Sequence, residues 1–138
     1  MYKRLSKENK ESDVEETNLP LTTEPEFRVT GIYGDINEER CSEAIYGLLA
    51  LHGTGQCLVA CESEDGSEYV EEYYKPIDFY ISTYGGQASD MFGVYDLMKK
   101  IRESTPIHTH GVGKVMSAGV LLLAAGTKGE RYIGENCR

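Results

Sequence analysis

The sequence predicts an α/β domain in which helices cover a mainly parallel β-sheet. Strand-like and helix-like segments alternate from about residue 27 to residue 138. Glycine-rich turns also come directly after strand-like segments, as expected where parallel strands lead into crossover helices. A length of 138 residues fits one domain.

Residues 1–26 are expected to form a mobile arm ahead of the folded domain, which spans residues 27–138. The arm is charged, poor in apolar residues and contains Pro20 and Pro25. Such a segment buries too little apolar surface to offset the entropy that it would lose on ordering. Two interpretations remain open, a disordered tail or a gating segment that orders on assembly.

The first half of the domain reads as a strand, a helix and a hairpin. Residues 27–33 alternate and favour β-structure. Residues 38–52 predict a helix, because apolar residues recur at helical spacing and acidic residues occupy the first turn. Strand-like residues 56–62 and 68–74 flank an Asp65-Gly66 turn signal and predict a β-hairpin.

The second half alternates strands with helices. Strands are predicted over residues 77–82, 106–112 and 131–133, and a helix over residues 87–102. A tight connection, residues 113–116, leads into a further helix at residues 117–125. That helix is apolar nearly all round, so we expect it to be buried.

Composition excludes several function classes. The net charge of −9 argues against a nucleic-acid or anionic-membrane surface, since phosphate binding needs clustered cations. No run approaches the ~20 apolar residues that span a membrane, and the N-terminus lacks the apolar stretch of a secretory signal. We therefore expect a cytoplasmic protein.

The four cysteines give no strong metal signal. Cys57 and Cys61 could share a zinc ion with nearby His52, but a fourth ligand is not evident. The default for Cys41, Cys57, Cys61 and Cys137 in a cytoplasmic protein is a free thiol. We predict neither a metal nor a cofactor.

Two segments suggest a place for chemistry. Gly85-Gly86 follows a strand, and such a pair exposes backbone N–H groups to a closely approaching ligand. Ser117 begins a helix, where unpaired N–H donors could stabilise an oxyanion formed by attack of its hydroxyl. The local alternative is that Ser117 is a plain helix N-cap.

Taken together, these segments resemble the ClpP family of serine peptidases. YISTYGGQASDMFGVYDLMKKI is similar to the family's strand, its S-P-G-G turn and the following helix. GVGKVMSAGVLLLAAGTKGERYIGENCR is similar to its G-x-A-A-S-M-G segment, the next helix, the A-G-x-K-G-x-R turn and the N-S-R triplet. FRVTGIYGDINEE resembles its first strand. The resemblance covers roughly residues 27–51 and 76–138, and implies the ClpP/crotonase-like fold of repeated β-α-β units.

The resemblance implies roles for individual residues. Ser117 matches the nucleophile, and the N–H groups of Gly86 and Ala118 match the oxyanion hole. A strip that holds the substrate backbone extended, by strand addition, matches Gly85, Gln87, Ala88 and Ser89.

The sequence also departs from the family pattern. The serine and proline before the glycine pair are Thr83 and Tyr84 here, and Ala118 replaces a larger residue after the nucleophile. The hairpin at about residues 52–75 is an insertion relative to the family, and its acidic tip could alter docking of a partner. The usual first helix of the family is not recognisable in residues 1–26.

The largest departure concerns the base. The family's catalytic histidine follows its N-S-R triplet by about four residues, whereas Asn136-Cys137-Arg138 ends this sequence. The triad aspartate and the handle that stacks two rings, the C-terminal part of the fold, are also missing. His108 and His110 share a strand face. They could substitute as a base, bind metal as an H-x-H pair or simply fill that face; His52 ends a helix and is assigned no chemistry.

The sequence suggests three alternative functions. The first is a ClpP-type proteolytic subunit, self-assembled in a ring (a heptamer by resemblance), that receives unfolded polypeptide from an AAA+ unfoldase. This 138-residue chain would be inactive alone, because a serine hydroxyl is a weak nucleophile without a base. The second is a non-catalytic homologue that joins a mixed ring or docks an unfoldase. The third, a crotonase-like acyl-CoA enzyme, lacks evident CoA-binding features.

Overall fold

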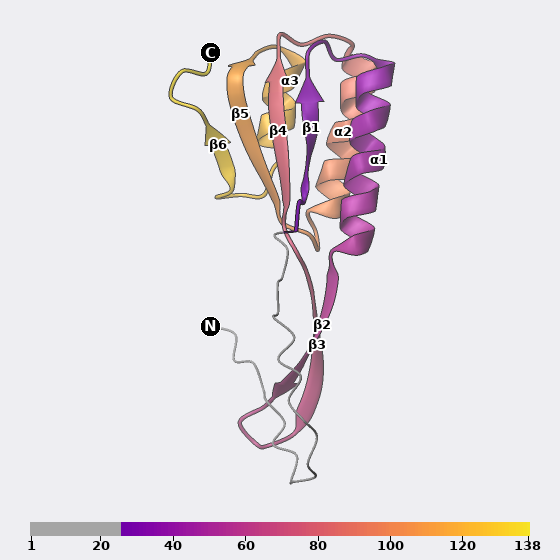
Figure 1. Cartoon of the computed structure of the whole chain (residues 1–138), viewed down its shortest axis with the longest axis vertical. Coiled ribbons are helices and arrows are strands. Elements are labelled where there is room, and N and C mark those ends of the chain that lie inside the picture. Colours follow the sequence, from indigo (N-terminus) through magenta and orange to yellow (C-terminus); the bar gives the residue numbers. More distant parts are fainter. Residues whose placement is uncertain (1–25) are drawn as a thin grey trace, which may run out of the picture.

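The computed structural model describes residues 26–138 (Figure 1). The mobile arm predicted for residues 1–26 therefore lies outside the described residues, apart from Glu26. All four cysteines are free thiols, and burial raises the pKa of the Cys41 thiol. No helix within residues 26–138 has both the length and the apolar character needed to cross a bilayer.

A four-stranded parallel sheet forms the centre of the domain. Its strands lie in the order β1 (Val29–Tyr33), β4 (Ile77–Thr83), β5 (Ile107–Val115) and β6 (Arg131–Ile133). All three neighbouring pairs are parallel. The predicted α/β fold with a mainly parallel sheet is confirmed.

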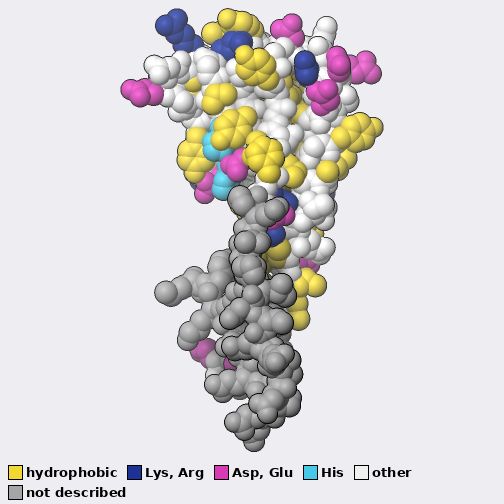
Figure 2. Space-filling view, in the orientation of Figure 1, with side chains coloured by type: hydrophobic (Ala, Val, Ile, Leu, Met, Phe, Trp, Pro, Cys, Tyr) yellow, Lys and Arg dark blue, Asp and Glu magenta, His cyan; other side chains and the backbone are white. Residues whose placement is uncertain are grey.

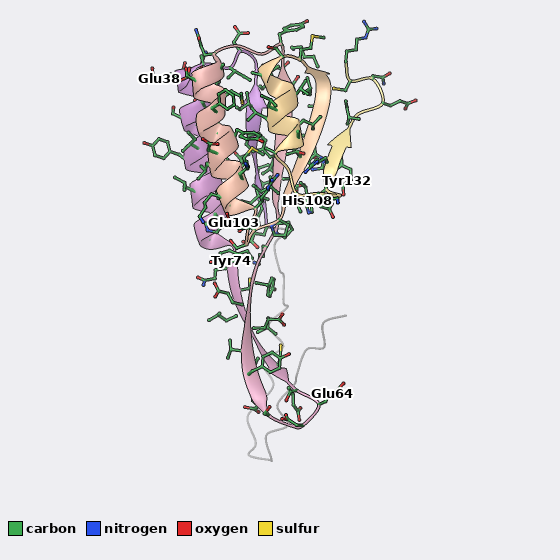
Figure 3. The ribbon with its side chains drawn as sticks, turned by 180° about the vertical axis from the view of Figure 1, so that it is seen from behind. Glu38, Glu64, Tyr74, Glu103, His108 and Tyr132 are labelled. Atoms are coloured by element: carbon green, nitrogen blue, oxygen red, sulfur yellow. The ribbon has the colours of Figure 1, made fainter. Side chains whose placement is uncertain are left out.

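Three helices cover one face of this sheet (Figures 1 and 3): α1 (Glu38–Thr54), α2 (Ala88–Ile101) and α3 (Ala118–Ala124). The Asn37 side chain caps α1 by accepting a 2.9 Å hydrogen bond from the N–H of Arg40. The core lies between the helices and the sheet, and its largest side chains include Ile36, Leu48, Ile77, Phe79, Ile81, Met91, Met98, Ile107 and Leu122.

Two details differ from the sequence prediction. Strand β5 continues through residues 113–115, which were expected to form a tight connection. The positive φ of Gly113 (69°) and a register shift beside Ile81 and Thr83 let pairing resume at Val115. Helix α3 is not buried all round, since Val120 is 50% and Leu121 42% exposed. It packs on β4, β5 and α2 through one side only, so its outer side has no cover within residues 26–138.

The predicted hairpin is present and projects from the body (Figure 1). Strands β2 (Gln56–Glu62) and β3 (Glu68–Tyr74) pair antiparallel along their whole length. The hairpin joins the start of β4, with Tyr74 near the body and Glu64 at the far tip (Figure 3). It therefore extends from the end of the sheet at which β4 begins.

No helix within residues 26–138 covers the second face of the sheet (Figure 1). The ring of His110 on β5 stacks between Tyr80 on β4 and Tyr132 on β6, with centroid distances of 4.5 and 5.2 Å. Figure 2 shows histidine, acidic and hydrophobic side chains gathered on this face. Because three strands in register present these rings, the stack is a direct product of the parallel pairing.

Candidate active site

The candidate site lies at the carboxyl ends of β4 and β5, where each strand leads into a helix. The Gly85-Gly86 turn follows β4, and Ser117 follows β5. Since these strands are parallel neighbours, the turn and the serine meet at the same edge of the sheet. This edge is opposite the end that carries the hairpin.

Ser117 has a strained backbone and a hydroxyl that makes no capping hydrogen bond. Its φ of 52° and ψ of −126° make it the only non-glycine residue with positive φ among residues 26–138. It occupies the N-cap position of α3, but its side chain makes no capping hydrogen bond. The N-cap interpretation of the hydroxyl is therefore wrong. Strained residues that the surrounding fold maintains are concentrated at functional sites.

Gly85 brings the turn into contact with Ser117. Its φ is 110°, and a β-carbon added there would lie 2.6 Å from Cβ and 3.0 Å from Oγ of Ser117. No real side chain tolerates such an approach, so only glycine allows this turn to pass the serine so closely.

Thr83 holds the two segments together. Its hydroxyl accepts a 2.9 Å hydrogen bond from the N–H of Gly85, and its carbonyl accepts a 3.1 Å bond from the N–H of Met116. Gly119 packs directly on its methyl group. The threonine that replaces the family's serine thus fixes both the glycine turn and the residue before Ser117.

Two N–H groups at this edge have no hydrogen-bond partner among the described residues. Neither the N–H of Gly86 nor that of Ala118 donates a hydrogen bond within the described part of the chain. Ile36 fixes the turn on its other side, since its N–H donates to Gly85 and its carbonyl accepts from Gln87, at 3.0 and 2.8 Å. Such fixed, free donors beside a hydroxyl suit the stabilisation of an oxyanion.

The predicted substrate strip divides into two parts. The backbone is extended at Gln87, with φ −68° and ψ 118°. Ala88 and Ser89 instead begin α2, and they offer the unpaired N–H groups of a first helical turn. An incoming peptide would therefore meet an extended edge only as far as Gln87.

None of the histidines within residues 26–138 contacts Ser117. His52 Nδ1 lies 2.7 Å from Thr105 Oγ1, at the far end of the sheet. His110 Nε2 lies 2.7 Å from Asp78 Oδ1. His108 lies between Asp78 and Glu130, near Tyr132 (Figure 3). His108 and His110 do share one strand face, as predicted, but that face is turned toward carboxylates.

The structure places a lysine side chain close to two tyrosine rings beside the site, an arrangement that the sequence did not predict. Lys114 Nζ lies 4.8 Å from the ring centroid of Tyr84 and 5.4 Å from that of Tyr33. Tyr84 directly precedes the glycine pair, and Lys114 lies three residues before Ser117. No sequence signal joins Lys114 to Tyr33, because the contact depends on the arrangement of the sheet.

Arg138 also lies near the site. Its N–H donates to the carbonyl of Gly113 at 3.2 Å, and its carbonyl accepts from the N–H of Val115 at 2.7 Å. It therefore runs beside the strand that leads into Ser117. No group of three or more His, Cys, Asp or Glu side chains in the described part forms a metal-binding arrangement.

Fold and site together define a class of protein. A parallel α/β domain presents a strained serine at a strand-to-helix turn, beside free backbone N–H groups. This combination is typical of serine hydrolases that pass through an acyl-enzyme.

Comparison with known proteins then identifies the family. The Clp protease family model matches residues 67–138, more than half of the sequence. The chain belongs to the Clp protease family.

Individual relatives agree with this assignment. The chain is 35% identical over 111 residues to ATP-dependent Clp protease proteolytic subunit 1 of Nocardia farcinica, covering 80% of this chain and 53% of that protein. It is 30% identical over 136 residues to proteolytic subunit 2 of Gluconobacter oxydans, covering 95% and 52%. The crystal structure of the ClpP protease catalytic domain from Plasmodium falciparum matches with a TM-score of 0.62 and 25% identity, over 80% of this chain and 52% of that one. The chain thus spans about half the length of these relatives.

Proposed function

We propose that this chain acts as part of a Clp-type proteolytic subunit, in which Ser117 attacks peptide bonds of unfolded polypeptides. The proposal rests on one observation. Ser117 has a strained backbone and a hydroxyl that makes no capping hydrogen bond, and it lies against the Gly85-Gly86 turn. Family membership supports the reaction class. By the same resemblance, the subunit would assemble into a ring and work with an AAA+ unfoldase in the cytoplasm.

The proposed mechanism is acyl transfer. Ser117 Oγ attacks the substrate carbonyl carbon while a base removes its proton. The N–H groups of Gly86 and Ala118 stabilise the oxyanion of the tetrahedral intermediate. Collapse of that intermediate expels the amine, which takes the proton, and leaves an ester on Ser117. Water then hydrolyses the ester and restores the serine.

The base would come from outside residues 26–138. The three histidines are engaged elsewhere, and without a base the rate should fall by several orders of magnitude. A residue following position 138 in a longer chain is one source, because Arg138 already lies beside the strand that leads to Ser117. A neighbouring subunit is another.

A specific observation favours a second candidate, a non-catalytic homologue in a mixed ring. No general base contacts Ser117 among the described residues. Such a protein would retain the fold and the docking surfaces without cutting.

Labelling with a serine-directed fluorophosphonate, followed by intact mass analysis, separates these functions. If the protein produced in the cell is heavier than 15.4 kDa and is labelled at Ser117, the result would support the peptidase function. Labelling of the 15.4 kDa chain itself would place the base on a neighbouring copy. Ser117→Ala should abolish the adduct, while Ser42→Ala, an unrelated serine on α1, should not. Absence of an adduct on every form would overturn the peptidase and leave the non-catalytic homologue.

A further inference from the structure

The β2–β3 hairpin forms a two-stranded sheet of its own. Within residues 26–138, β2 and β3 form a ladder only with each other, and no third strand lies along either outer edge. The two strands pack mainly on one another rather than on the body, from which they project (Figure 1). An isolated two-stranded hairpin is marginally stable in water. A further strand along one edge would complete it.

One face of the hairpin alternates apolar and acidic side chains. The register places Leu58 opposite Glu72, Ala60 opposite Val70 and Glu62 opposite Glu68. Leu58 is 69% and Val70 66% exposed. This face therefore offers two apolar contacts, flanked by carboxylates.

The charge of the hairpin has a single sign. Residues 56–74 contain no lysine or arginine, and their carboxylates are those of Glu62, Glu64, Asp65, Glu68, Glu71 and Glu72. Pairing with the hairpin of a second copy would place like charges together, which is unfavourable. A basic segment is the complementary occupant. Strand β3, with three of the carboxylates against one on β2, is the more attractive edge.

A buried arginine fixes the direction in which the hairpin projects. Arg28 is only 7% exposed, and its guanidinium donates to the carbonyls of Leu51, Lys75 and Pro76 at 2.6, 3.2 and 3.1 Å. The Leu51 carbonyl belongs to the last turn of α1, which leads into β2, and the other two follow β3 directly, so one side chain joins both ends of the hairpin to the body. The ring of His52 also stacks on Tyr74 at the base, at 4.8 Å.

This anchoring is costly in itself. Burying a guanidinium requires its donors to be paired, yet Arg28 Nη1 makes no hydrogen bond in the described structure and has only a long ion pair, 3.9 Å from Glu26 Oε1. The hairpin is thus anchored at its base by a buried arginine, yet its strands make few contacts with the rest of the domain. This combination is typical of an interface with another molecule.

We propose that the β2–β3 hairpin is a docking surface for an extended, basic segment of another protein, which adds as a strand along the edge of β3. Main-chain hydrogen bonds to β3 would supply affinity. Lysine or arginine side chains on one face of the added strand would meet Glu68 and Glu72, and their aliphatic stems would cover Val70. The side chains between them would point to the opposite face, beside Tyr69 and Glu71. The surface lies at the opposite end of the sheet from Ser117, so the proposal is independent of catalysis.

The first test is binding of a synthetic nonapeptide of alternating lysine and valine to the full 138-residue chain, followed by fluorescence anisotropy at low salt. The combined change Glu68→Gln, Glu71→Gln and Glu72→Gln should weaken binding about tenfold. The matched control, Glu39→Gln with Glu43→Gln and Glu103→Gln, removes three exposed carboxylates from the body. It should stay within about twofold of the unmodified chain. Equal weakening in both variants, or no measurable binding, would overturn the proposal.

Two further measurements separate strand addition from general attraction between charges. A peptide with proline in place of each valine keeps the charge but lacks half of the N–H donors, and should bind much more weakly. Hydrogen exchange at β3 amides should slow with the lysine–valine peptide, while exchange in α1 should not change. Equal binding of the proline peptide would overturn the proposal. So would tighter binding after deletion of residues 1–10, since the edge would then belong to the chain's own N-terminal lysines and arginine.

Discussion

At the scale of single residues, Ser117 combines an energetically unfavourable backbone conformation with a hydroxyl that makes no capping hydrogen bond. Its φ of 52° lies in the region that favours glycine, and its hydroxyl caps nothing. Strain of this kind costs of order 1–3 kcal/mol. The surrounding contacts maintain it, chiefly the Met116 hydrogen bond to Thr83 and the packing of Gly85.

The first prediction separates a free serine from a cap by stability alone. Ser117→Ala should change the free energy of unfolding by less than about 0.5 kcal/mol, whereas loss of a true cap costs about 1 kcal/mol. Ser117→Gly should be more stable than Ser117→Ala by about 1 kcal/mol, because glycine relieves the strain while its greater freedom when unfolded offsets part of the gain. Urea unfolding measures both. A loss of about 1 kcal/mol or more in Ser117→Ala would restore the capping role.

A second prediction concerns the contact between the glycine turn and the serine. Gly85→Ala should cost at least about 2 kcal/mol more than Gly34→Ala. Both glycines have positive φ, 110° and 93°, so both variants carry backbone strain. A β-carbon at Gly34 meets nothing within 4 Å, whereas one at Gly85 collides with Ser117. The difference between the two unfolding free energies therefore isolates the collision, and equal costs would contradict the close approach.

At the scale of elements, the hairpin depends on its turn. The hydroxyl of Ser63 donates to the Asp65 carboxylate, and so do the hydroxyl and N–H of Ser67. These bonds lower the pKa of Asp65 from an ordinary 3.8 to about 2. Since they favour the charged form, the turn is best formed while Asp65 is ionised.

A pH dependence follows from this lowered pKa. The contribution of Asp65 to the turn is fully present above pH 3.8, its ordinary value, and is lost as the pH falls toward its folded pKa of about 2. An NMR titration of the Asp65 carboxyl and the Ser67 amide should show a shared midpoint near pH 2. The variant Asp65→Asn should remove the titration of the Ser67 amide. A midpoint near pH 4 in the unmodified chain would show that Ser63 and Ser67 do not stabilise the ionised carboxylate of Asp65.

At the scale of the whole molecule, the main feature is the exposed apolar surface of residues 26–138. Large exposed apolar side chains occur on α3, on the second face of the sheet and on the hairpin, among them Leu58, Val70, Tyr80, Val120, Leu121, Tyr132 and Ile133. Exposed apolar surface of this extent marks interfaces or promotes aggregation.

The isolated 138-residue chain should therefore be marginally stable or self-associate. Sedimentation velocity should show larger species growing with concentration over about 1–100 µM. Replacement of Leu121, on the uncovered side of α3, by glutamine should reduce that association. The change Glu39→Gln on α1 serves as a control, because it leaves the apolar surface intact. A monomer at every concentration, with a cooperative high-temperature melt, would contradict the prediction.

The overall fold also shows how far the sequence could predict this molecule. Most of the fold was predictable, because strand and helix periodicities are local. The approach of Ser117 to the Gly85-Gly86 turn was predictable too, because parallel strands bring their carboxyl ends together. The roles of Ser117, Gly86 and Ala118 remain predictions, now with a geometry that suits them. The path of β5 through residues 113–115 was missed because glycine at Gly113 reads as a turn, although a register shift keeps the strand going.

The sequence by itself determined the order of elements, the hairpin and the glycine and serine segments, since each depends on residues that are near neighbours along the chain. Only the tertiary structure decided that the Ser117 hydroxyl does not cap α3, that Thr83 joins the two segments, and that Lys114 lies close to both Tyr33 and Tyr84. It also decided that one side of α3 remains exposed. The physical reason is that these contacts join residues far apart in sequence, and the register of the strands, which no local pattern specifies, sets which of them meet.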